Sequence, residues 1–241
     1  MKKRFEKINR VKGELSLPGD KSISHRAVIF SAMASGISSI LNISLGEDVK
    51  STMNIMKQLG AKIESKNGIT LIEGCGFKEF KKPYADLDCG NSGTSARLIT
   101  GLLVAQNFSS RLIGDESLSK RPMNRVIEPL KRMGAEFEVS EPLTLPLTVI
   151  PKLGINPITY EMPVASAQVK SSILIAGLHC DEESSVIERE QTRNHTEIML
   201  GLPVTFENER IISSSSRKYY PETKDYFIPG DISSSAFHIV L

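Results

Sequence analysis

Apolar positions along the chain fall into two kinds of helix pattern, and the two kinds alternate. One kind is apolar on nearly every side, which is typical of helices enclosed within a protein. It covers residues 27–34, 98–105 and 172–178. The other kind keeps its apolar residues on one face at helical spacing, as in Val126, Ile127, Leu130 and Met133. The chain therefore predicts paired helices, one buried and one amphipathic.

Short strand patterns and turns surround these helices in a fixed order. A strand pattern that opens with two serines follows each buried helix, at residues 38–43, 109–113 and 184–188. A glycine suited to the left-handed end of a helix follows each amphipathic helix, at Gly60, Gly134 and Gly201. Strand pairs such as residues 61–64 with 69–73 then close each unit. The order predicts three β-α-β-α-β-β units, or a circular shift of them, of about 70 residues each.

One fully apolar helix in each unit predicts an α/β (or α+β) fold of an uncommon kind. Helices that cover a central sheet need only one apolar face. We therefore expect the units to share a core of helices, with the sheets outside. A fourth unit begins at Gly230, where a turn leads into another apolar stretch that runs to Leu241. From this we expect the chain to be a fragment, or one half, of a longer protein.

Composition narrows the possibilities only slightly. The 241 residues, 40% of them hydrophobic and 24% charged, are those of an ordinary globular protein. A formal net charge of +2 gives no sign of nucleic-acid or membrane binding, and no apolar run is long enough to span a membrane. Three scattered cysteines without metal-ligand spacing predict no metal site and favour the reducing cytoplasm.

The first candidate chemistry lies at residues 17–26, directly before the first buried helix. Lys21 and Arg26 place two cations there, with Ser22 and Ser24 between them. The free N–H groups and positive dipole end of a helix N-terminus suit a phosphate or a carboxylate. The segment predicts an anion site. The alternative is an ordinary serine-capped helix start that binds nothing.

The other helix starts repeat this composition. Residues 89–97 and 164–170 place small and hydroxyl residues before a cation or an amide, and residues 120–125 and 190–197 add further cations. A cation at a helix N-terminus opposes the helix dipole, and a bound anion would remove that conflict. The alternative is a set of solvated basic helix starts, with His195 at the surface. If the units pack around a pseudo-axis, these starts converge on one anionic site.

Four of the segments resemble signatures of the 5-enolpyruvylshikimate-3-phosphate synthase family. They are residues 17–26, 90–97, 120–123 and 165–171, and the match runs in register across essentially the whole chain. The resemblance implies two domains of three β-α-β-α-β-β units with buried helices. It implies transfer of the enolpyruvyl group of phosphoenolpyruvate to the 5-hydroxyl of shikimate 3-phosphate, with release of phosphate and without metal or cofactor. It also implies a cytoplasmic monomer whose partners are these small anions, with no nucleic acid and no membrane.

The resemblance assigns binding residues position by position. For shikimate 3-phosphate they are Lys21, Ser22, Arg26, Ser166, Ala167, Gln168 and Arg193; for phosphoenolpyruvate they are Lys21, Gly93 through its backbone, Arg121 and Gln168. Ala167 stands where many members have a second serine, and His195 stands where many have a tyrosine that contacts substrate. The family's acid–base groups correspond to a region beyond Leu241. The resemblance therefore assigns no catalytic residue within this sequence.

The family pattern also implies a division of the chain. Residues 20–229 are expected to form a complete three-unit domain, with residues 1–19 and 230–241 as pieces of a split second domain. Three alternatives remain at this point. A UDP-N-acetylglucosamine enolpyruvyl transferase shares the fold, but the loop at residues 120–122 lacks that enzyme's reactive cysteine. An RNA 3′-phosphate cyclase would need a nucleotide-linked histidine. A non-catalytic anion-binding domain would need neither a reactive cysteine nor such a histidine.

Overall fold

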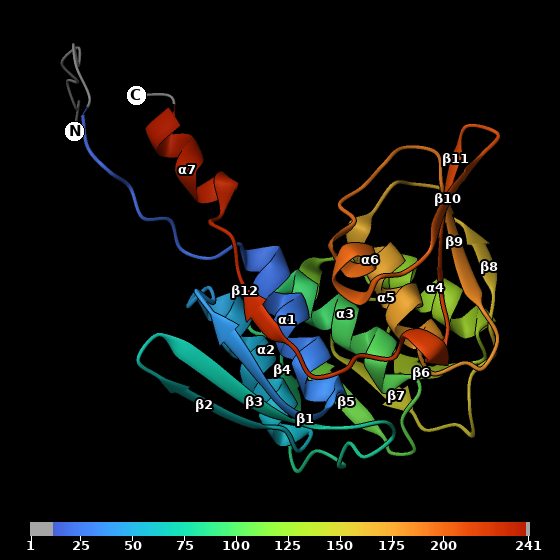
Figure 1. Cartoon of the computed structure of the whole chain (residues 1–241). Helices are drawn as coiled ribbons and strands as arrows, with labels where there is room; N and C mark the ends of the chain where they lie inside the picture. The colour runs from blue at the N-terminus through green and yellow to red at the C-terminus, as the bar shows by residue number, and fades with distance from the viewer. Residues whose placement is uncertain (1–11, 240–241) are drawn as a thin grey trace, which may run out of the picture.

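The structure is a computed structural model that describes residues 12–239, and three units of the same build make up its body (Figure 1). The first unit contains α1 (Lys21–Met33), β1 (Ser35–Leu41), α2 (Glu47–Gln58), β2 (Lys62–Lys66) and β3 (Ile69–Cys75). The second contains β4 (Leu87–Asp88), α3 (Gly93–Leu103), β5 (Ser110–Ile113), the 3-10 turn η1 (Leu118–Lys120), α4 (Asn124–Arg132), β6 (Glu136–Val139) and β7 (Leu147–Ile150). The third contains β8 (Thr159–Glu161), α5 (Ala167–Gly177), β9 (Ser184–Glu188), α6 (His195–Leu200), β10 (Val204–Glu207) and β11 (Arg210–Ser215). The 3-10 turn η2 (Arg217–Tyr219), β12 (Asp225–Phe227) and α7 (Ile232–Ile239) follow.

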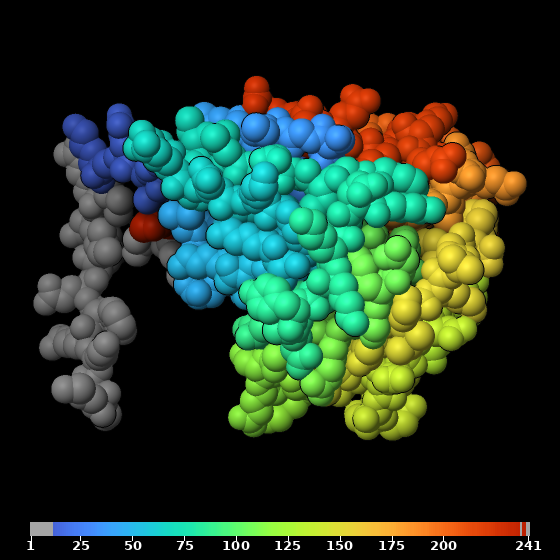
Figure 2. All heavy atoms as spheres, turned by 90° about the horizontal axis from the view of Figure 1, so that it is seen from below, coloured from blue at the N-terminus to red at the C-terminus, as the bar shows by residue number. Residues whose placement is uncertain are grey.

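Each unit forms a four-stranded sheet with the same internal order. The second and third sheets run β4-β5-β7-β6 and β8-β9-β11-β10, with the first two strands parallel and the others antiparallel. Among the described residues, no strand precedes α1 in the first unit, and β12 from the far end of the chain lies beside β1 instead, pairing Ser39 with Asp225 and Leu41 with Phe227. Figure 2 shows this C-terminal stretch in red against the blue and cyan of the first unit. The predicted repeat is confirmed, with the circular shift in the first unit.

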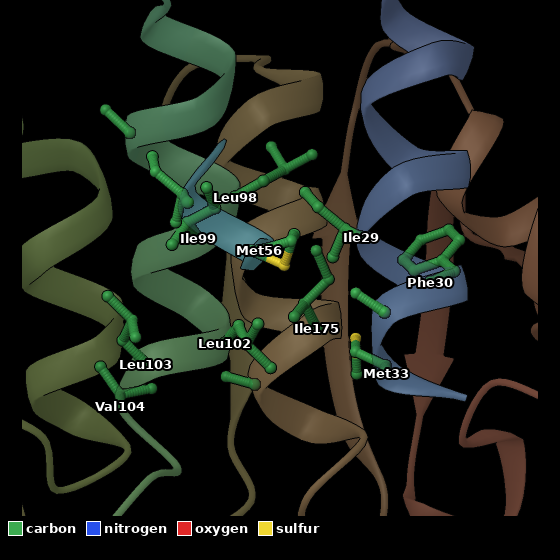
Figure 3. Close-up of a cluster of buried hydrophobic side chains, with 14 of the residues drawn as sticks. Ile29, Phe30, Met33, Met56, Leu98, Ile99, Leu102, Leu103, Val104 and Ile175 are labelled. Atoms are coloured by element: carbon green, nitrogen blue, oxygen red, sulfur yellow. The ribbon is translucent and has the colours of Figure 1, made fainter. Parts of the chain in front are cut away.

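The helices lie inside and the sheets outside, as the apolar pattern predicts. Residues 27–34 of the α1 region are buried without exception, and so are residues 98–104 and 171–178. Figure 3 shows the side chains between these helices, among them Ile29, Met56, Leu98, Ile99, Leu102 and Ile175. Because other helices pack against each of the three, and strands of their own sheets also pack against α1 and α5, burial covers the whole circumference and not one face.

Small residues let two of the buried helices approach closely. A Cβ at Gly101 of α3 would lie 2.2 Å from the backbone oxygen of Ser172 in α5, far inside van der Waals contact. At the other end of α5, a Cβ at Gly177 would lie 2.4 Å from the hydroxyl of Ser215. The glycine at position 101 therefore sets the spacing between α3 and α5.

Gly101→Ala is expected to destabilise the chain by about 1–3 kcal/mol, because the added methyl group forces the two helix backbones apart. In an unconstrained helix interior the same change stabilises by about 1 kcal/mol. Urea denaturation of the 241-residue chain measures the difference. Gly13→Ala is the matched control, since a Cβ there meets nothing within 4 Å. A gain in stability from Gly101→Ala would contradict the close approach.

A buried histidine packs against two aromatic rings, which also contact each other, where α5 ends. The ring of His179 stacks on Phe77 at 5.8 Å between centroids and meets Tyr220 edge-on at 5.5 Å. Its Nδ1 lies 3.2 Å from the backbone oxygen of Ile175, and its Nε2 has no partner among the described residues. Burial lowers the pKa of His179 to about 4. The ring is therefore neutral at physiological pH, with the proton on Nδ1.

This histidine predicts a loss of stability in acid. The unfolded chain takes up the proton near pH 6.5, while the folded chain resists it down to about pH 4. The stabilisation is therefore complete above pH 6.5 and is lost as the pH falls through that window. His179→Phe is expected to flatten the slope by up to about 1.4 kcal/mol per pH unit. Urea denaturation between pH 7 and 5 measures the slope, with exposed His238→Phe as the control that leaves it unchanged.

Two segments leave the three-unit body side by side (Figure 1). Gly19 and Gly230 form an antiparallel bridge, in which Asp20 N donates to Pro229 O at 2.8 Å and Asp231 N to Pro18 O at 2.9 Å. A Cβ at Gly19 would lie 1.8 Å from the backbone oxygen of Asn42, so only glycine fits this crossing. The bridge lies at the predicted division of the chain, which itself stays a prediction. Residues 1–11, 240 and 241 of the two predicted pieces lie outside the described residues.

Candidate functional site

The starting ends of α1, α3 and α5 are joined by side-chain hydrogen bonds. Gln168 at the start of α5 accepts from Arg97 Nη1 at 2.9 Å and donates to Thr94 Oγ1 at 3.0 Å, both on α3. Arg26 of α1 donates from Nη2 to Ser171 Oγ of α5 at 2.6 Å. The helix starts therefore converge, as a pseudo-axis through the repeat requires.

Each of these three helices begins with a side-chain cap. Asp20 accepts from the Ile23 backbone, Ser92 from Ser95 and Ser166 from Val169, at 2.8, 3.1 and 3.4 Å. The first turns of the three helices contain no acidic residue. The caps of α3 and α5 are neutral serines, so the positive dipole ends of these two helices remain available to an anion, whereas the Asp20 carboxylate already occupies that of α1.

Lys21 lies at the open edge of this convergence. Its ammonium is 2.9 Å from Oδ2 of Asp48 in α2, and half of the lysine side chain is exposed. An exposed ion pair contributes little net energy, so a charged ligand can replace Asp48 at small cost. Sequence reasoning missed Asp48, which stands in an ordinary acidic first turn of α2.

Arg26 is buried and makes more hydrogen bonds within the protein than the sequence suggests. It is 3% exposed and donates to Thr196 Oγ1 at 2.8 Å, to Ser171 Oγ and to the backbone oxygen of Ser22 at 3.0 Å. Burial lowers the pKa of Arg26 to about 10, and the Glu197 carboxylate opposes that shift. The guanidinium thus stays charged at neutral pH, with two of its five N–H groups left for a ligand.

A buried chain of polar side chains runs beneath Lys21 and Asp48. His25 Nδ1 lies 2.7 Å from Thr52 Oγ1, which lies 2.7 Å from Ser95 Oγ, so α1, α2 and α3 are linked. Burial lowers the pKa of His25 to about 3. His25 is therefore a neutral structural residue and not a proton donor to a ligand.

Arginines of the second unit form the other half of the site. Arg121 donates from Nη2 to Asn91 Oδ1 at 2.6 Å, and Asn91 in turn donates to Asp115 at 2.6 Å. A Cβ at Gly93 would lie 2.6 Å from Arg97 Nη1 and 3.6 Å from Arg121 Nη1, so glycine lets both guanidinium groups approach the backbone. The structure thereby brings Gly93 and Arg121 together, as the resemblance implies.

Arg97 is the cation that ends the segment at residues 89–97, and the resemblance gave it no binding role, but the structure places it among the candidate site residues. Burial lowers the pKa of Arg97, and the positive charges of Arg121 and Arg125 lower it further. Arg97 bridges α3 to α5 through Gln168, and its position four residues after Gly93 on one helix is the signal that could have revealed it. Arg97, Arg121 and Arg125 therefore repel one another, and a bound anion would reduce that repulsion.

The third unit adds an exposed arginine. Arg193 lies in the loop between β9 and α6, and its charge lowers the pKa values of Arg26 and His195. Ser166, Ala167 and Gln168 are partly exposed at the start of α5. His195, expected at the surface, is half-buried, and burial is the main cause of its lowered pKa. The assigned residues of the first and third units thus lie around one place.

Lys170 does not join the cations of the site. The sequence places it last in the third helix-start segment, but its ammonium is 1% exposed and lies between two glutamates. The distances are 3.0 Å to Glu188 Oε2 and 2.6 Å to Glu197 Oε1. A lysine so enclosed is unavailable to a ligand, which corrects the interpretation of this segment.

Two further searches concern the described residues alone. Within residues 12–239, no group of three or more His, Cys, Asp and Glu side chains could hold a metal ion. In the same range, no helix has the length and apolar character needed to cross a membrane. Cys75, Cys89 and Cys180 are all free thiols.

Comparison of the sequence with known proteins gives consistent matches. Curated proteins named 3-phosphoshikimate 1-carboxyvinyltransferase, from Streptococcus gordonii and Streptococcus mutans, are 45% and 46% identical to 95% and 93% of this chain. The matched regions cover 54% and 53% of those proteins. The chain therefore spans about half the length of the curated relatives it matches.

Solved structures with the same fold lead to the family. An EPSP synthase from Acinetobacter baumannii superposes with a TM-score of 0.87 and 43% identity, over 95% of this chain and 52% of its own. The enolpyruvyl transferase NikO from Streptomyces tendae, at 15% identity, shares the fold with a TM-score of 0.71 over 96% of this chain and 55% of its own. The family model described as EPSP synthase (3-phosphoshikimate 1-carboxyvinyltransferase) matches residues 5–241. This chain belongs to the EPSP synthase family.

Proposed function

We propose that this chain supplies the shikimate 3-phosphate site, and part of the phosphoenolpyruvate site, of an enolpyruvyl transferase. The whole protein transfers the enolpyruvyl group of phosphoenolpyruvate to the 5-hydroxyl of shikimate 3-phosphate and releases phosphate. The observation that carries the proposal is the meeting of three helix N-termini among Lys21, Arg26, Arg97, Arg121 and Arg193. Two anionic substrates are the chemistry that such a concentration of positive charge serves.

Shikimate 3-phosphate binds between the first and third units in this proposal. Arg193, Ser166 and the first backbone N–H groups of α5 hold the phosphate, with Ala167 contributing only its backbone. Ser22, Arg26 and Gln168 hold the rest of the molecule. Support comes from Arg26 and Gln168, which already link the helices that carry the other residues.

Phosphoenolpyruvate binds beside it, against the second unit. Arg121 and the backbone at Gly93 hold its negative groups, and Gln168 reaches it from α5. Lys21 leaves Asp48 and contacts both substrates. This chain therefore neutralises and orients the two reactants, which removes translational freedom from the reaction. The proton transfers belong to groups in the remainder of the protein.

The organisation and location of the protein are part of the same proposal. Residues 20–229 form a complete three-unit domain, which is supported by β12 closing the sheet of the first unit. The protein works as a monomer without nucleic acid and in the cytoplasm, and the three free thiols support the last of these, since they suit a reducing compartment.

Solution NMR of the 241-residue chain tests the substrate. Shikimate 3-phosphate is expected to shift the backbone amides of Ser22, Ser166 and Gln168, while UDP-N-acetylglucosamine leaves them in place. The reverse result would favour the UDP-sugar enzyme. An absence of shifts with either compound would contradict the proposed site.

A steady-state assay tests the division of labour. The chain alone is expected to bind shikimate 3-phosphate without turnover, because the proton-transfer groups are supplied elsewhere. Activity within tenfold of a full-length family member would show that the 241 residues contain the whole catalytic machinery.

A further inference from the structure

A buried cluster of three charged side chains connects the helices beneath the arginines of the first and third units. Lys170 of α5 and Glu188 at the end of β9 are each 1% exposed, and Glu197 of α6 is 3% exposed. The lysine ammonium contacts both carboxylates, at 3.0 and 2.6 Å. The three formal charges sum to −1 in a place shielded from water.

One arm of this cluster leads to Arg193. Glu188 accepts hydrogen bonds from the backbone nitrogen of Thr192 at 2.8 Å and from its hydroxyl at 3.0 Å. Thr192 directly precedes Arg193, in a loop that forms no helix or strand from residue 189 to 194. Because the loop has no regular backbone ladder, these two bonds fix the chain next to the arginine.

The other arm leads to Arg26. Glu197 contacts Lys170, and its neighbour Thr196 accepts from Arg26 Nε at 2.8 Å. Thr196 also donates to Ser171 at 2.8 Å, and Ser171 is the neighbour of Lys170. Lys170 and Ser171 of α5 therefore contact Glu197 and Thr196 of α6. The guanidinium of Arg26 donates to the hydroxyls of both Ser171 and Thr196.

We propose that Lys170 is a positioning residue that sets Arg26 through Glu197 and Arg193 through Glu188. A buried ion cluster is a poor source of net stability, because each charged group gives up its hydration. The Lys170 ammonium contacts both Glu197 of α6 and Glu188, which holds the loop before α6. An apolar side chain of the same volume cannot form these two ion pairs. The identity of the ligand that the two arginines receive rests on the proposed function, whereas the placement of Arg26 does not.

The test breaks one arm without changing the shape of the side chain. Glu197→Gln keeps the volume of Glu197 and removes the charge that Lys170 contacts. Glu197→Asp is the second variant, which keeps the charge and draws the carboxylate back by one methylene group. Glu161→Gln is the matched control, since Glu161 pairs at the surface of the same unit with Arg189 at 2.8 Å.

Two measurements on the 241-residue chain separate placement from ligand. The first is hydrogen exchange of the Arg26 Nε–H by NMR, with the buried amides of α3 as an internal reference for global opening. The second is the affinity for shikimate 3-phosphate by calorimetry. Glu197→Gln is expected to speed Nε–H exchange at least tenfold and to weaken the affinity at least tenfold, with Glu197→Asp in the same direction and Glu161→Gln within twofold.

The sign of the affinity change distinguishes positioning from simple charge. Removing a negative charge near Arg26 would tighten the binding of an anion if electrostatics alone mattered. Tighter binding by Glu197→Gln, or Nε–H exchange unchanged relative to the α3 amides, overturns the proposal. If the unaltered chain binds no shikimate 3-phosphate but Glu197→Gln still releases the Arg26 Nε–H, the proposed function fails and the positioning of Arg26 stands.

Discussion

Replacing Arg193 with alanine is expected to weaken the binding of shikimate 3-phosphate by about tenfold to 150-fold. A hydrogen bond to a charged group contributes about 1.5–3 kcal/mol, and each 1.4 kcal/mol is a tenfold change in affinity. Arg193 is exposed, and its charge acts on Arg26 and His195, so a phosphate placed there relieves repulsion between cations. Its removal leaves the core untouched, so the loss in affinity is not a loss of folding.

Calorimetry with two ligands gives this prediction its control. Shikimate, which lacks the phosphate, is expected to bind the unaltered chain and the Arg193→Ala variant equally weakly. Arg189→Ala is the matched control, because Arg189 lies four residues earlier in the same loop and pairs with Glu161 at the surface. Equal losses for both ligands, or an equal loss from Arg189→Ala, would contradict the assignment of Arg193 to the phosphate.

Lys170→Met is expected to cost about 3–5 kcal/mol of folding free energy. The substitution preserves the volume of the side chain but leaves two buried carboxylates without their shared counter-charge, and an unpaired buried charge carries a penalty of this size. Since whole domains are stable by only about 5–15 kcal/mol, the variant approaches the limit of folding. Urea denaturation of the 241-residue chain measures the change.

An exposed ion pair provides the comparison for Lys170. Lys62 pairs with Glu73 at 2.9 Å while its side chain is 74% exposed. Lys62→Met is expected to cost at most about 1 kcal/mol. A cost below 1 kcal/mol for Lys170→Met would mean that the buried cluster is far better hydrated than its burial indicates.

Local patterns were sufficient to predict the repeat. The apolar helices are buried in the structure, and the helix-ending glycines Gly60, Gly134 and Gly201 have positive φ. Both properties depend on neighbours close in the sequence. The leading strand of the first unit could not be found in this way. β12 pairs with β1 about 186 residues away, and nothing in its three residues indicates a partner.

The candidate site divides along the same line. Lys21, Arg121 and the start of α5 could be proposed as candidates from the sequence because each lies in a segment with its own composition. The hydrogen bonds of Arg26 could not be predicted, because Ser171 and Thr196 lie 145 and 170 residues from it in the sequence. In the sequence Lys170 is one more cation, but the fold buries it between Glu188 and Glu197. Arg97 is the last residue of its segment in the sequence, and only the fold places it beside α5. Sequence alone identifies the charges, and the fold decides which of them face a ligand.

The pairing of β1 with β12 has a consequence for synthesis on the ribosome. The first unit emerges early, but its sheet keeps an unpaired parallel edge until residues 225–227 have left the exit tunnel. An open strand edge is a template for pairing with other chains. A nascent or truncated chain that stops short of Asp225 is therefore exposed to aggregation, whereas three more residues close the edge. Late closure of this kind also raises the contact order, which slows folding.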